Sequence, residues 1–307
     1  MDSRYLRALV AVADNGGISA AAHALGYAQS SVSAQLKRLE ADLGVSVLVR
    51  AGTGAALTEA GHRLLPYARE ALALEERMRR AARGDRTRLR IGAQESLAHV
   101  WVPEVLAALE YGAGGPDTGA DVVLTVAQRR SLERSFAAGE LDLVFQYDNG
   151  VRAVGPSAVV GHDRTVLVAA PGHPLAGQRE KVSAEQLLRY DFLVAERGCT
   201  SEMLVDRFGQ DMLAGAQQTL LQGSFAALLR LIGHGHGVTL LPELSVAREL
   251  REGELVELRP TEPIRPLSIV AQWHPRLGPA ETAVHTLLDL ARRADPLPEA
   301  TQAAHAS

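Results

Sequence analysis

A short segment near the N-terminus carries side chains suited to hydrogen bonding with a polar partner. Gln29, Ser30 and Ser33 supply amide and hydroxyl groups, and Lys37 and Arg38 add positive charge at helical spacing. Gln and Ser side chains bond to base edges in the major groove of DNA, whereas Lys and Arg neutralise phosphates. An ordinary solvated helix face would have a similar composition, but the neighbouring turn and helix favour DNA.

Two helices joined by a tight turn are predicted to position these side chains. Ser19 is the predicted N-cap of the first helix, and Gly26 is predicted to end it in the left-handed conformation. The second helix is predicted from about Gln29 to Leu43, with Gly44 after it. Its apolar residues recur at i, i+4, i+7 and i+11 and form one stripe: Val32, Leu36, Leu39 and Leu43.

A β-hairpin is predicted directly after these helices. Two short strands, Val47–Val49 and Ala55–Leu57, flank the Gly-rich turn 50–54. Arg50 and Thr53 in this turn are candidate DNA contacts.

A long helix is predicted from Thr58, a plausible N-cap, to about Arg83, with Pro66 bending it. Apolar residues recur along it at helical spacing: Leu64, Ala68, Ala71, Leu74 and Met78. By itself this stripe fits a surface helix packed on its own domain. Arginines near the end of this helix and just beyond it are expected to form a solvated, charged hinge. The alternative is a second contact with DNA. They are Arg77, Arg79, Arg80, Arg83, Arg86 and Arg88.

Several motifs occur in a characteristic order: LVAVA at 9–13, GISAAA at 17–22, QSSVS at 29–33, LEADLG at 39–44, Arg50, and LTEAG at 57–61. This region resembles the winged helix-turn-helix of LysR-type transcriptional regulators. Ala28 stands where the family usually has a Ser or Thr that caps the second helix, and Val47-Leu48 replaces the family's Leu-Phe pair.

The resemblance implies an assembly and a second domain. It favours antiparallel pairing of the 59–86 helix with a second subunit, within a homodimer or a homotetramer that binds paired half-sites in promoter DNA. It also implies a C-terminal effector domain similar to periplasmic binding proteins, supported by segments 165–175 and 235–242.

The predicted domains are 1–58 for DNA binding, 59–86 for the linker, and 87–294 for an α/β effector domain. Strands near Leu89–Gly92, Val122–Val126 and 139–145 alternate with helices near Leu97–Leu109 and Leu132–Ala138, which indicates a parallel sheet. Lobe I is expected at about 87–160 and 268–294, lobe II at about 161–267, and a disordered tail at 295–307.

Composition is consistent with a cytoplasmic bacterial protein. The 307 residues include one cysteine, and no apolar run is long enough to span a bilayer. Residues 1–83 contain 11 Lys and Arg against 8 Asp and Glu, a net charge of +3, and the remainder is at −7. A mildly basic module on an acidic body fits contact with DNA at one end, and the small excess favours two copies acting together.

Polar residues at predicted strand ends and helix starts are the candidate effector ligands: Gln94, Ser96, Arg129, Gln146, Thr200 and Ser201. Ser96 is predicted to cap a helix whose free N–H groups favour anions. Arg129 is either a clamp for an anionic group or a surface arginine. Glu95 opposes a purely anionic ligand, so the hypothesis of a small anionic metabolite leaves an amphoteric or neutral one open.

No cofactor, catalytic residue or metal site is predicted. Cys199 has no second cysteine with which to form an intramolecular disulfide, and a structural thiol is favoured over a redox sensor. His234 and His236 lie among glycines at a predicted helix-to-strand turn without further ligands at suitable spacing.

The favoured function is a LysR-type regulator of transcription controlled by a small-molecule effector. One alternative is an architectural DNA binder without a ligand. The other is an α/β enzyme with an accessory DNA-binding module, although no catalytic or nucleotide-binding motif was found. The expected partners are promoter DNA, the effector, further copies of the chain and RNA polymerase, but no membrane.

Overall fold

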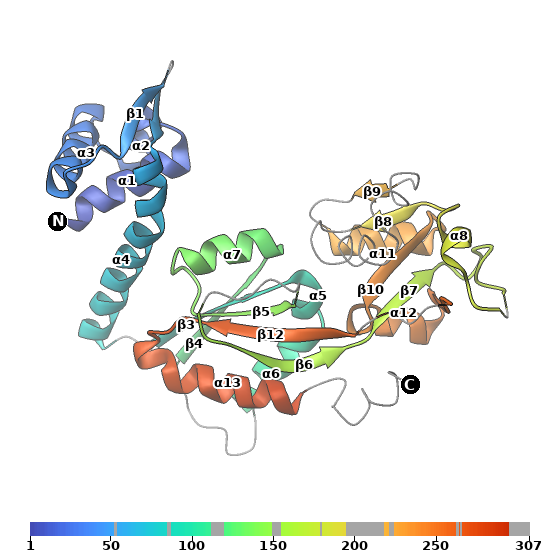
Figure 1. Cartoon of the computed structure of the whole chain (residues 1–307). Coiled ribbons are helices and arrows are strands. Elements are labelled where there is room, and N and C mark those ends of the chain that lie inside the picture. Colours follow the sequence, from blue (N-terminus) through green and yellow to red (C-terminus); the bar gives the residue numbers. More distant parts are fainter. Residues whose placement is uncertain are drawn as a thin grey trace.

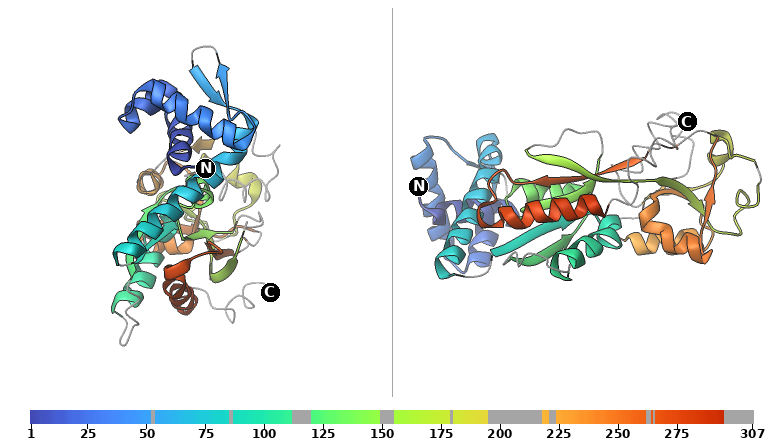
Figure 2. Two further views of the ribbon diagram at one scale, coloured as in Figure 1. Left: turned by 90° about the vertical axis from the view of Figure 1, so that its left-hand side faces the viewer. Right: turned by 90° about the horizontal axis from the view of Figure 1, so that it is seen from below.

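The computed structural model describes residues 1–51, 54–84, 87–111, 120–148, 155–178, 180–194, 218–220, 224–261, 264 and 266–294. An N-terminal helical domain is joined through one long helix to two α/β lobes (Figure 1). The right-hand view of Figure 2 shows the N-terminal domain at one end of the molecule and lobe II at the other. The predicted fold class, a winged helix-turn-helix followed by a linker helix and a two-lobed α/β domain, is confirmed.

The N-terminal domain contains α1 (Ser3–Asn15), α2 (Ile18–Leu25) and α3 (Gln29–Leu43). Gly26 and Gly44 end α2 and α3 with φ of 67° and 69°, as predicted. The prediction for Ser19 was wrong. The N-cap of α2 is Gly17, and Ser19 lies inside the first turn without the capping role.

The buried side of α3 faces α1 and α2. Val32, Leu36 and Leu39 are at most 2% exposed and belong to one cluster with Leu9 and Val12 of α1. The last residue of the predicted stripe, Leu43, is 37% exposed because α3 extends beyond this core. Burial of the other three side chains orients the helix.

The hairpin after α3 consists of β1 (Leu48–Ala51) and β2 (Gly54–Leu57), paired antiparallel. Glu40 of α3 holds its start: Oε1 accepts hydrogen bonds from Val47 N at 2.9 Å and Leu48 N at 3.2 Å. A side chain of the helix thereby fixes where the wing begins.

The linker helix α4 (Glu59–Arg83) starts where the wing ends. Thr58 Oγ1 accepts a hydrogen bond from Gly61 N, which confirms Thr58 as its cap. Gly61 permits a close approach, because a Cβ at this position would lie 2.3 Å from Val47 O. The helix continues through Pro66.

Lobe I contains a five-stranded sheet in the order β4-β3-β5-β12-β6. Its strands are β3 (Thr87–Ala93), β4 (Ala120–Val126), β5 (Leu143–Tyr147), β6 (Ser157–Asp163) and β12 (Leu267–Trp273). β3 pairs in parallel with β4 and β5, whereas β12 is antiparallel to β5 and β6. Helices α6 (Trp101–Tyr111) and α13 (Glu281–Arg293) cover one face, and α7 (Arg129–Ala137) lies on the other (Figures 1 and 2).

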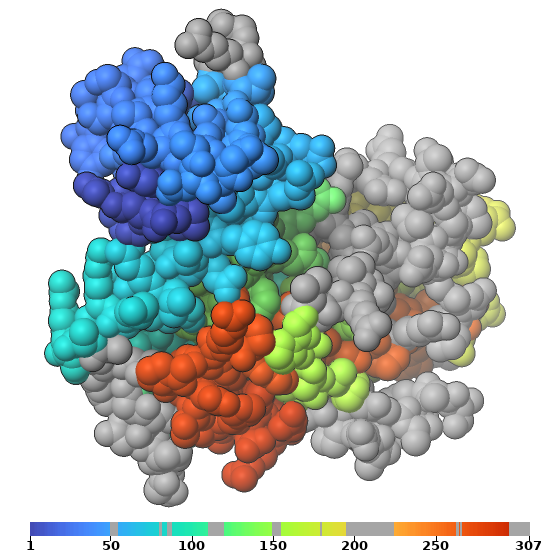
Figure 3. All heavy atoms as spheres, turned by 60° about the vertical axis from the view of Figure 1, so that its left-hand side comes forward, coloured from blue at the N-terminus to red at the C-terminus, as the bar shows by residue number. Residues whose placement is uncertain are grey.

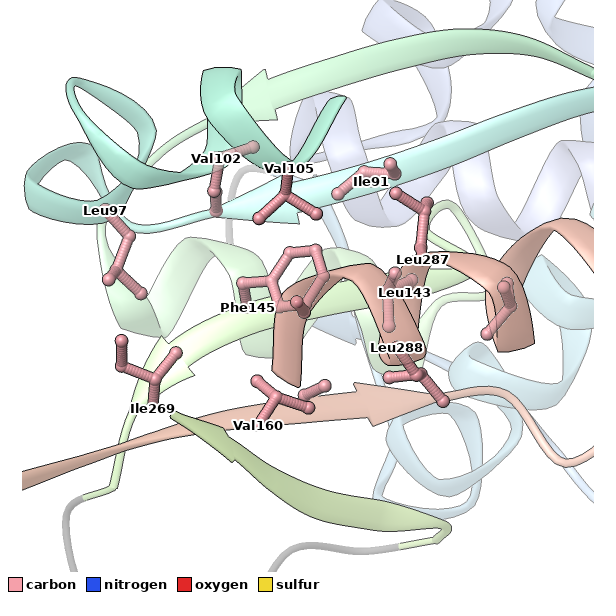
Figure 4. Packing of buried hydrophobic residues seen from close by; sticks show 14 of the residues in the cluster. Ile91, Leu97, Val102, Val105, Leu143, Phe145, Val160, Ile269, Leu287 and Leu288 are labelled. Carbon is pink, nitrogen blue, oxygen red and sulfur yellow. The ribbon is translucent and has the colours of Figure 1, made fainter. Parts of the chain in front are cut away.

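The core of lobe I lies between the sheet and α6 with α13. Figure 4 shows the sheet residues Ile91, Leu143, Phe145 and Ile269 with Val102, Val105, Leu287 and Leu288 of the two helices. The ring of Trp101 packs edge-on against Phe145 at a centroid distance of 5.4 Å. Its Nε1 donates to Ala294 O at 2.7 Å, which ties α6 to the end of α13.

Lobe II contains a second five-stranded sheet in the order β11-β7-β10-β8-β9. Its strands are β7 (Thr165–Ala169), β8 (Phe192–Val194), β9 (Gln218–Leu220), β10 (Val238–Pro242) and β11 (Val256–Leu258). Its helical elements within the described residues are α8 (Ala184–Leu187), α11 (Phe225–Gly233), the 3-10 helix η1 (Glu243–Val246) and α12 (Ala247–Glu252).

The chain passes between the lobes twice, once from β6 to β7 and once from β11 to β12 (Figure 1). We call residues 163–165, which join β6 to β7, the hinge. The expected lobe boundary at 160/161 falls inside β6, whose last residue, Asp163, pairs with Leu267 of β12.

The helix predicted over Leu97–Leu109 is two helices, α5 (Glu95–Ala98) and α6. Pro103 lies in the first turn of α6, the part of a helix that tolerates its missing N–H, and this explains why the chain restarts there. The Gly-rich segment 112–116 and the tail 295–307 lie outside the described residues. None of the described helices is long and apolar enough to cross a membrane.

Candidate DNA-binding surface and effector site

The polar residues predicted to contact DNA share the outer side of α3. Gln29, Ser30, Lys37 and Arg38 are exposed, and Ser33 is half-buried. They lie away from the buried stripe that packs on α1 and α2. Among the described residues, nothing covers this side of the helix in the single chain.

The N-terminus of α3 has no side-chain cap. Ala28 occupies the N-cap position in an extended conformation, as the sequence predicted. The first backbone N–H groups of α3 therefore have no capping side chain, and such groups favour a phosphate. Arg50 lies in β1, but its side chain and all of Thr53 are outside the described residues.

Three predicted effector residues lie at or beside the end of β5. Gln94 is 4% exposed, and its Oε1 accepts a hydrogen bond from Tyr147 N at 2.7 Å. Arg129, the first residue of α7, is also 4% exposed and donates from Nη2 to Tyr147 O. The two side chains thereby bind both backbone polar groups of Tyr147, and Gln146 directly precedes it.

Gln146 has an unused acceptor. Its side chain is 9% exposed, and Oε1 has no hydrogen-bond partner within the described part of the chain. A buried polar atom without a partner costs about 1–3 kcal/mol. A ligand that donates to this oxygen would remove that cost.

The remaining predicted effector residues are not brought to this point by described contacts. Ser96 is half-buried in α5, but the N-cap is Gln94, so the predicted capping role of Ser96 was wrong. Thr200, Ser201 and Cys199 lie outside the described residues.

Glu95 makes a contact between the two lobes. It is the first residue of α5 in lobe I, and its Oε1 accepts a hydrogen bond from Phe225 N at 3.2 Å. Phe225 is the first residue of α11 in lobe II, whose N-cap is Ser224. A carboxylate at a helix N-terminus is stabilised by the helix dipole, so this contact favours approach of the lobes.

A second connection lies at the hinge. Asp163 Oδ2 accepts from Tyr147 OH at 2.6 Å, and Oδ1 accepts from Leu244 N at 3.3 Å. Burial raises the pKa of the Asp163 carboxyl from 3.8 to about 6, although these hydrogen bonds act in the opposite direction. Beside it, Arg164 binds Glu243 through two nitrogens at 2.7 Å and Glu257 at 2.8 Å.

The two histidines that the sequence analysis did not assign as metal ligands lie at a turn. His234 is the C-cap of α11, and His236 follows before β10. Among the described residues, no group of three or more His, Cys, Asp or Glu side chains is arranged to hold a metal ion.

Two family models match the chain. The model described as "Bacterial regulatory helix-turn-helix protein, lysR family" matches residues 3–62, and the model described as "LysR substrate binding domain" matches residues 82–296. The chain belongs to the LysR family. It is a DNA-binding transcriptional regulator with an effector-binding domain.

Similar proteins agree with this assignment. A "Probable hydrogen peroxide-inducible genes activator" of Mycobacterium avium is 32% identical over 252 residues, which is 81% of this chain and 80% of that protein. The "HTH-type transcriptional regulator YofA" of Bacillus subtilis is 30% identical, covering 80% of this chain and 83% of its own length.

Solved structures share the fold. Full-length CbnR in complex with its target DNA aligns with a TM-score of 0.63 at 24% identity, covering 96% of this chain and 100% of that one. A full-length OxyR variant from Pseudomonas aeruginosa aligns with a TM-score of 0.62 at 20% identity, covering 95% of each chain.

Sequence analysis of this LysR-type regulator missed three side chains that connect its parts. Glu95 was considered only as a group that repels anions, and Asp163 was not singled out. Arg77 was assigned to the solvated, charged arginine segment at the end of the linker helix. Arg77 in fact lies 3.7 Å from Asp142 of lobe I. No motif marks these contacts, because each joins residues far apart in the sequence.

Asp163 predicts a pH dependence of stability. The pKa of the Asp163 carboxyl is about 6 in the folded LysR-type regulator and 3.8 in an exposed carboxyl, so folding favours the protonated form. The contribution of this group to the free energy of unfolding is therefore fully present below pH 3.8 and is lost as the pH rises through 6. We expect Asp163→Asn to remove about 2–3 kcal/mol of this dependence. The melting temperature of the variant relative to the native chain should therefore increase between pH 4 and 7.5 in calorimetry.

Glu140→Gln is the matched control, because Glu140 is exposed in the same lobe. This variant should follow the native pH profile. An Asp163→Asn profile parallel to the native one would contradict the assignment.

Proposed function

We propose that two copies of the chain place α3 in successive major grooves of promoter DNA, under the control of a small amphoteric effector bound near the end of β5. The observation that carries this proposal is the division of α3 into a buried apolar side and an uncovered side with hydroxyl, amide and cationic groups. Such a helix is stable on its own domain and leaves its polar groups for another molecule.

The residues are assigned different roles on DNA. Gln29, Ser30 and Ser33 lie near the start of α3 and would contact base edges, whereas Lys37 and Arg38 would bind phosphates. Arg50 and Thr53 of the wing would contact the backbone beside them. The uncapped N–H groups after Ala28 add a further phosphate site.

Ser33→Ala tests base recognition. We expect it to weaken binding to a duplex selected from random DNA by roughly tenfold, while affinity for an unrelated duplex stays unchanged. Arg50→Ala should weaken both, because phosphate contacts carry no sequence information. Ser46→Ala, in the turn before the wing, is the control for a lost hydroxyl, and titrations at fixed salt provide the measurement. Equal losses of Ser33→Ala on both duplexes would exclude base recognition by Ser33.

The linker helix supports a dimer. Four residues with a spacing of i, i+4, i+7 and i+11 lie on one exposed side of α4: Tyr67, Ala71, Leu74 and Met78. Tyr67 is 69%, Leu74 47% and Met78 64% exposed. A contiguous apolar stripe of this kind, on a family member that binds DNA, fits pairing with the same stripe of a second subunit.

Leu74→Glu should disrupt this pairing. We expect the dimer dissociation constant to rise by about 100-fold or more, because the change places two charges in an apolar contact. Sedimentation analysis over a concentration series measures it. Arg83→Glu, exposed farther along the helix, should leave the dimer intact. An unchanged dimer with Leu74→Glu would locate the interface elsewhere.

The effector is inferred to carry both an anionic group and a hydrogen-bond donor. The buried guanidinium of Arg129 is suited to the first and the unpaired Oε1 of Gln146 to the second. Free amino acids have this combination. One structural neighbour, full-length LysG from Corynebacterium glutamicum, is described with bound effector Arg; it has a TM-score of 0.59 at 20% identity and covers 95% of this chain and 99% of that one.

Gln146→Leu separates a ligand contact from a structural role. Without ligand, we expect this variant to be more stable by about 1–3 kcal/mol, because it removes a buried acceptor without a partner. In a thermal-shift screen of amino acids and of mono- and dicarboxylates, the compound that stabilises the native chain should stabilise Gln146→Leu much less. Equal shifts in the two proteins would remove Gln146 from the site.

The same screen distinguishes the alternative functions. Stabilisation by none of these compounds, with DNA binding intact, would favour an architectural protein, and turnover of a bound compound would favour an enzyme. Membership of a regulator family supports a non-catalytic, cytoplasmic role. RNA polymerase as a partner stays a prediction.

A further inference from the structure

The linker helix has three different sides. Leu64, Ala68 and Leu72 pack on the core of the N-terminal domain, and the stripe around Leu74 is exposed. A third side, with Glu70, Ala73 and Arg77 at i, i+3 and i+7, faces lobe I of the same chain. Figure 3 shows the N-terminal domain and α4 along one side of the effector domain.

Gly139 brings the helix and lobe I together. This buried residue follows α7 with φ of 68°, and a Cβ on it would lie 3.4 Å from Glu70 Cα and 3.8 Å from Ala73 Cβ. The positive φ favours glycine, and the two distances are those of ordinary van der Waals contact between the turn and the helix. The turn after α7 therefore contacts the linker helix closely.

Asp142 is the charged centre of this contact. Its side chain is 3% exposed; Oδ2 accepts from Arg90 N at 2.9 Å and from Arg90 Nε at 3.0 Å, and Oδ1 accepts from Nη2 at 2.6 Å. Arg77 of α4 places Nη1 3.7 Å from the same Oδ1. Burial lowers the pKa of His274, which lies near Glu70, Arg77, Asp142 and Arg90, so this imidazole is neutral at pH 7.5.

Two strands lead from Asp142 to the candidate effector residues. β5 begins at Leu143, directly after Asp142, and ends at Tyr147, which binds Gln94 and Arg129. β3 contains Arg90 and leads to Gln94 and Glu95. Both strands are central in the lobe I sheet, so a displacement at one end is transmitted to the other with little bending.

We infer that the contact of Arg77 with Asp142, seated by Gly139, couples the effector end of lobe I to the orientation of the DNA-binding domain. Arg77 is thus a positioning residue of the linker. The conformation with this ion pair formed is one of two, and both the effector and DNA shift the equilibrium between them. The inference rests on the proposed function, since it specifies how ligand control reaches the DNA.

The test uses reciprocity and needs no effector. If the sites are coupled, DNA must change the affinity for the effector by the same factor by which an effector changes the affinity for DNA, so DNA binding alone must alter the effector end. We expect a duplex selected from random DNA to change amide hydrogen exchange at residues 94–98 and 146–148 of the full-length protein by about fivefold or more.

Arg77→Gln should abolish this remote change while the protein still binds the duplex, and Arg77→Lys should retain it. Arg83→Gln, which removes an exposed arginine of the same helix, should behave like the native chain. A remote change that persists in Arg77→Gln, or that is missing in the native chain, would overturn the inference. Failure to select any duplex would overturn both this inference and the proposed function, and the selection step alone identifies that case.

Discussion

The fixation of β5 at both ends is the constraint on which the rest of the structure depends. All five residues of the strand are buried in the middle of the lobe I sheet. At its start, Asp142 neutralises Arg90 of the neighbouring strand; at its end, the backbone of Tyr147 is bound by Gln94 and Arg129, and its hydroxyl by Asp163. The linker, the proposed effector site and the hinge are therefore all attached to one rigid element.

Buried charged groups also lie where parts of the chain are joined. They include Asp142 at the linker, Asp163 at the hinge, and Arg129 at the end of β5. Burying them is costly unless each is hydrogen-bonded, and each has a hydrogen-bond partner in another part of the chain. A buried polar contact is directional, so it defines the relative positions of two elements more narrowly than apolar packing alone.

The elements were predictable because their signals are local. Three of the four residues in the α3 stripe, the glycines that end α2 and α3, and the order of strands and helices after residue 87 agree with the prediction, although one predicted helix is two, and the family resemblance identified the winged domain. The predicted N-caps Ser19 and Ser96 were wrong because each helix begins earlier in the chain: the N-cap of α2 is Gly17 and that of α5 is Gln94. The contacts of Glu95, Asp163 and Arg77 join distant residues, so their partners follow only from the tertiary fold.

The hydrogen bond from Phe225 N to Glu95 also has a quantitative meaning for sensing. The N-terminus of α11 already carries a carboxylate supplied by the chain itself. Any anion that binds there must compete with this tethered group, whose effective concentration is on the order of millimolar. An anionic ligand at this helix therefore needs a higher concentration for half-saturation than it would at an unoccupied helix N-terminus, and the length and charge of a single side chain set the difference.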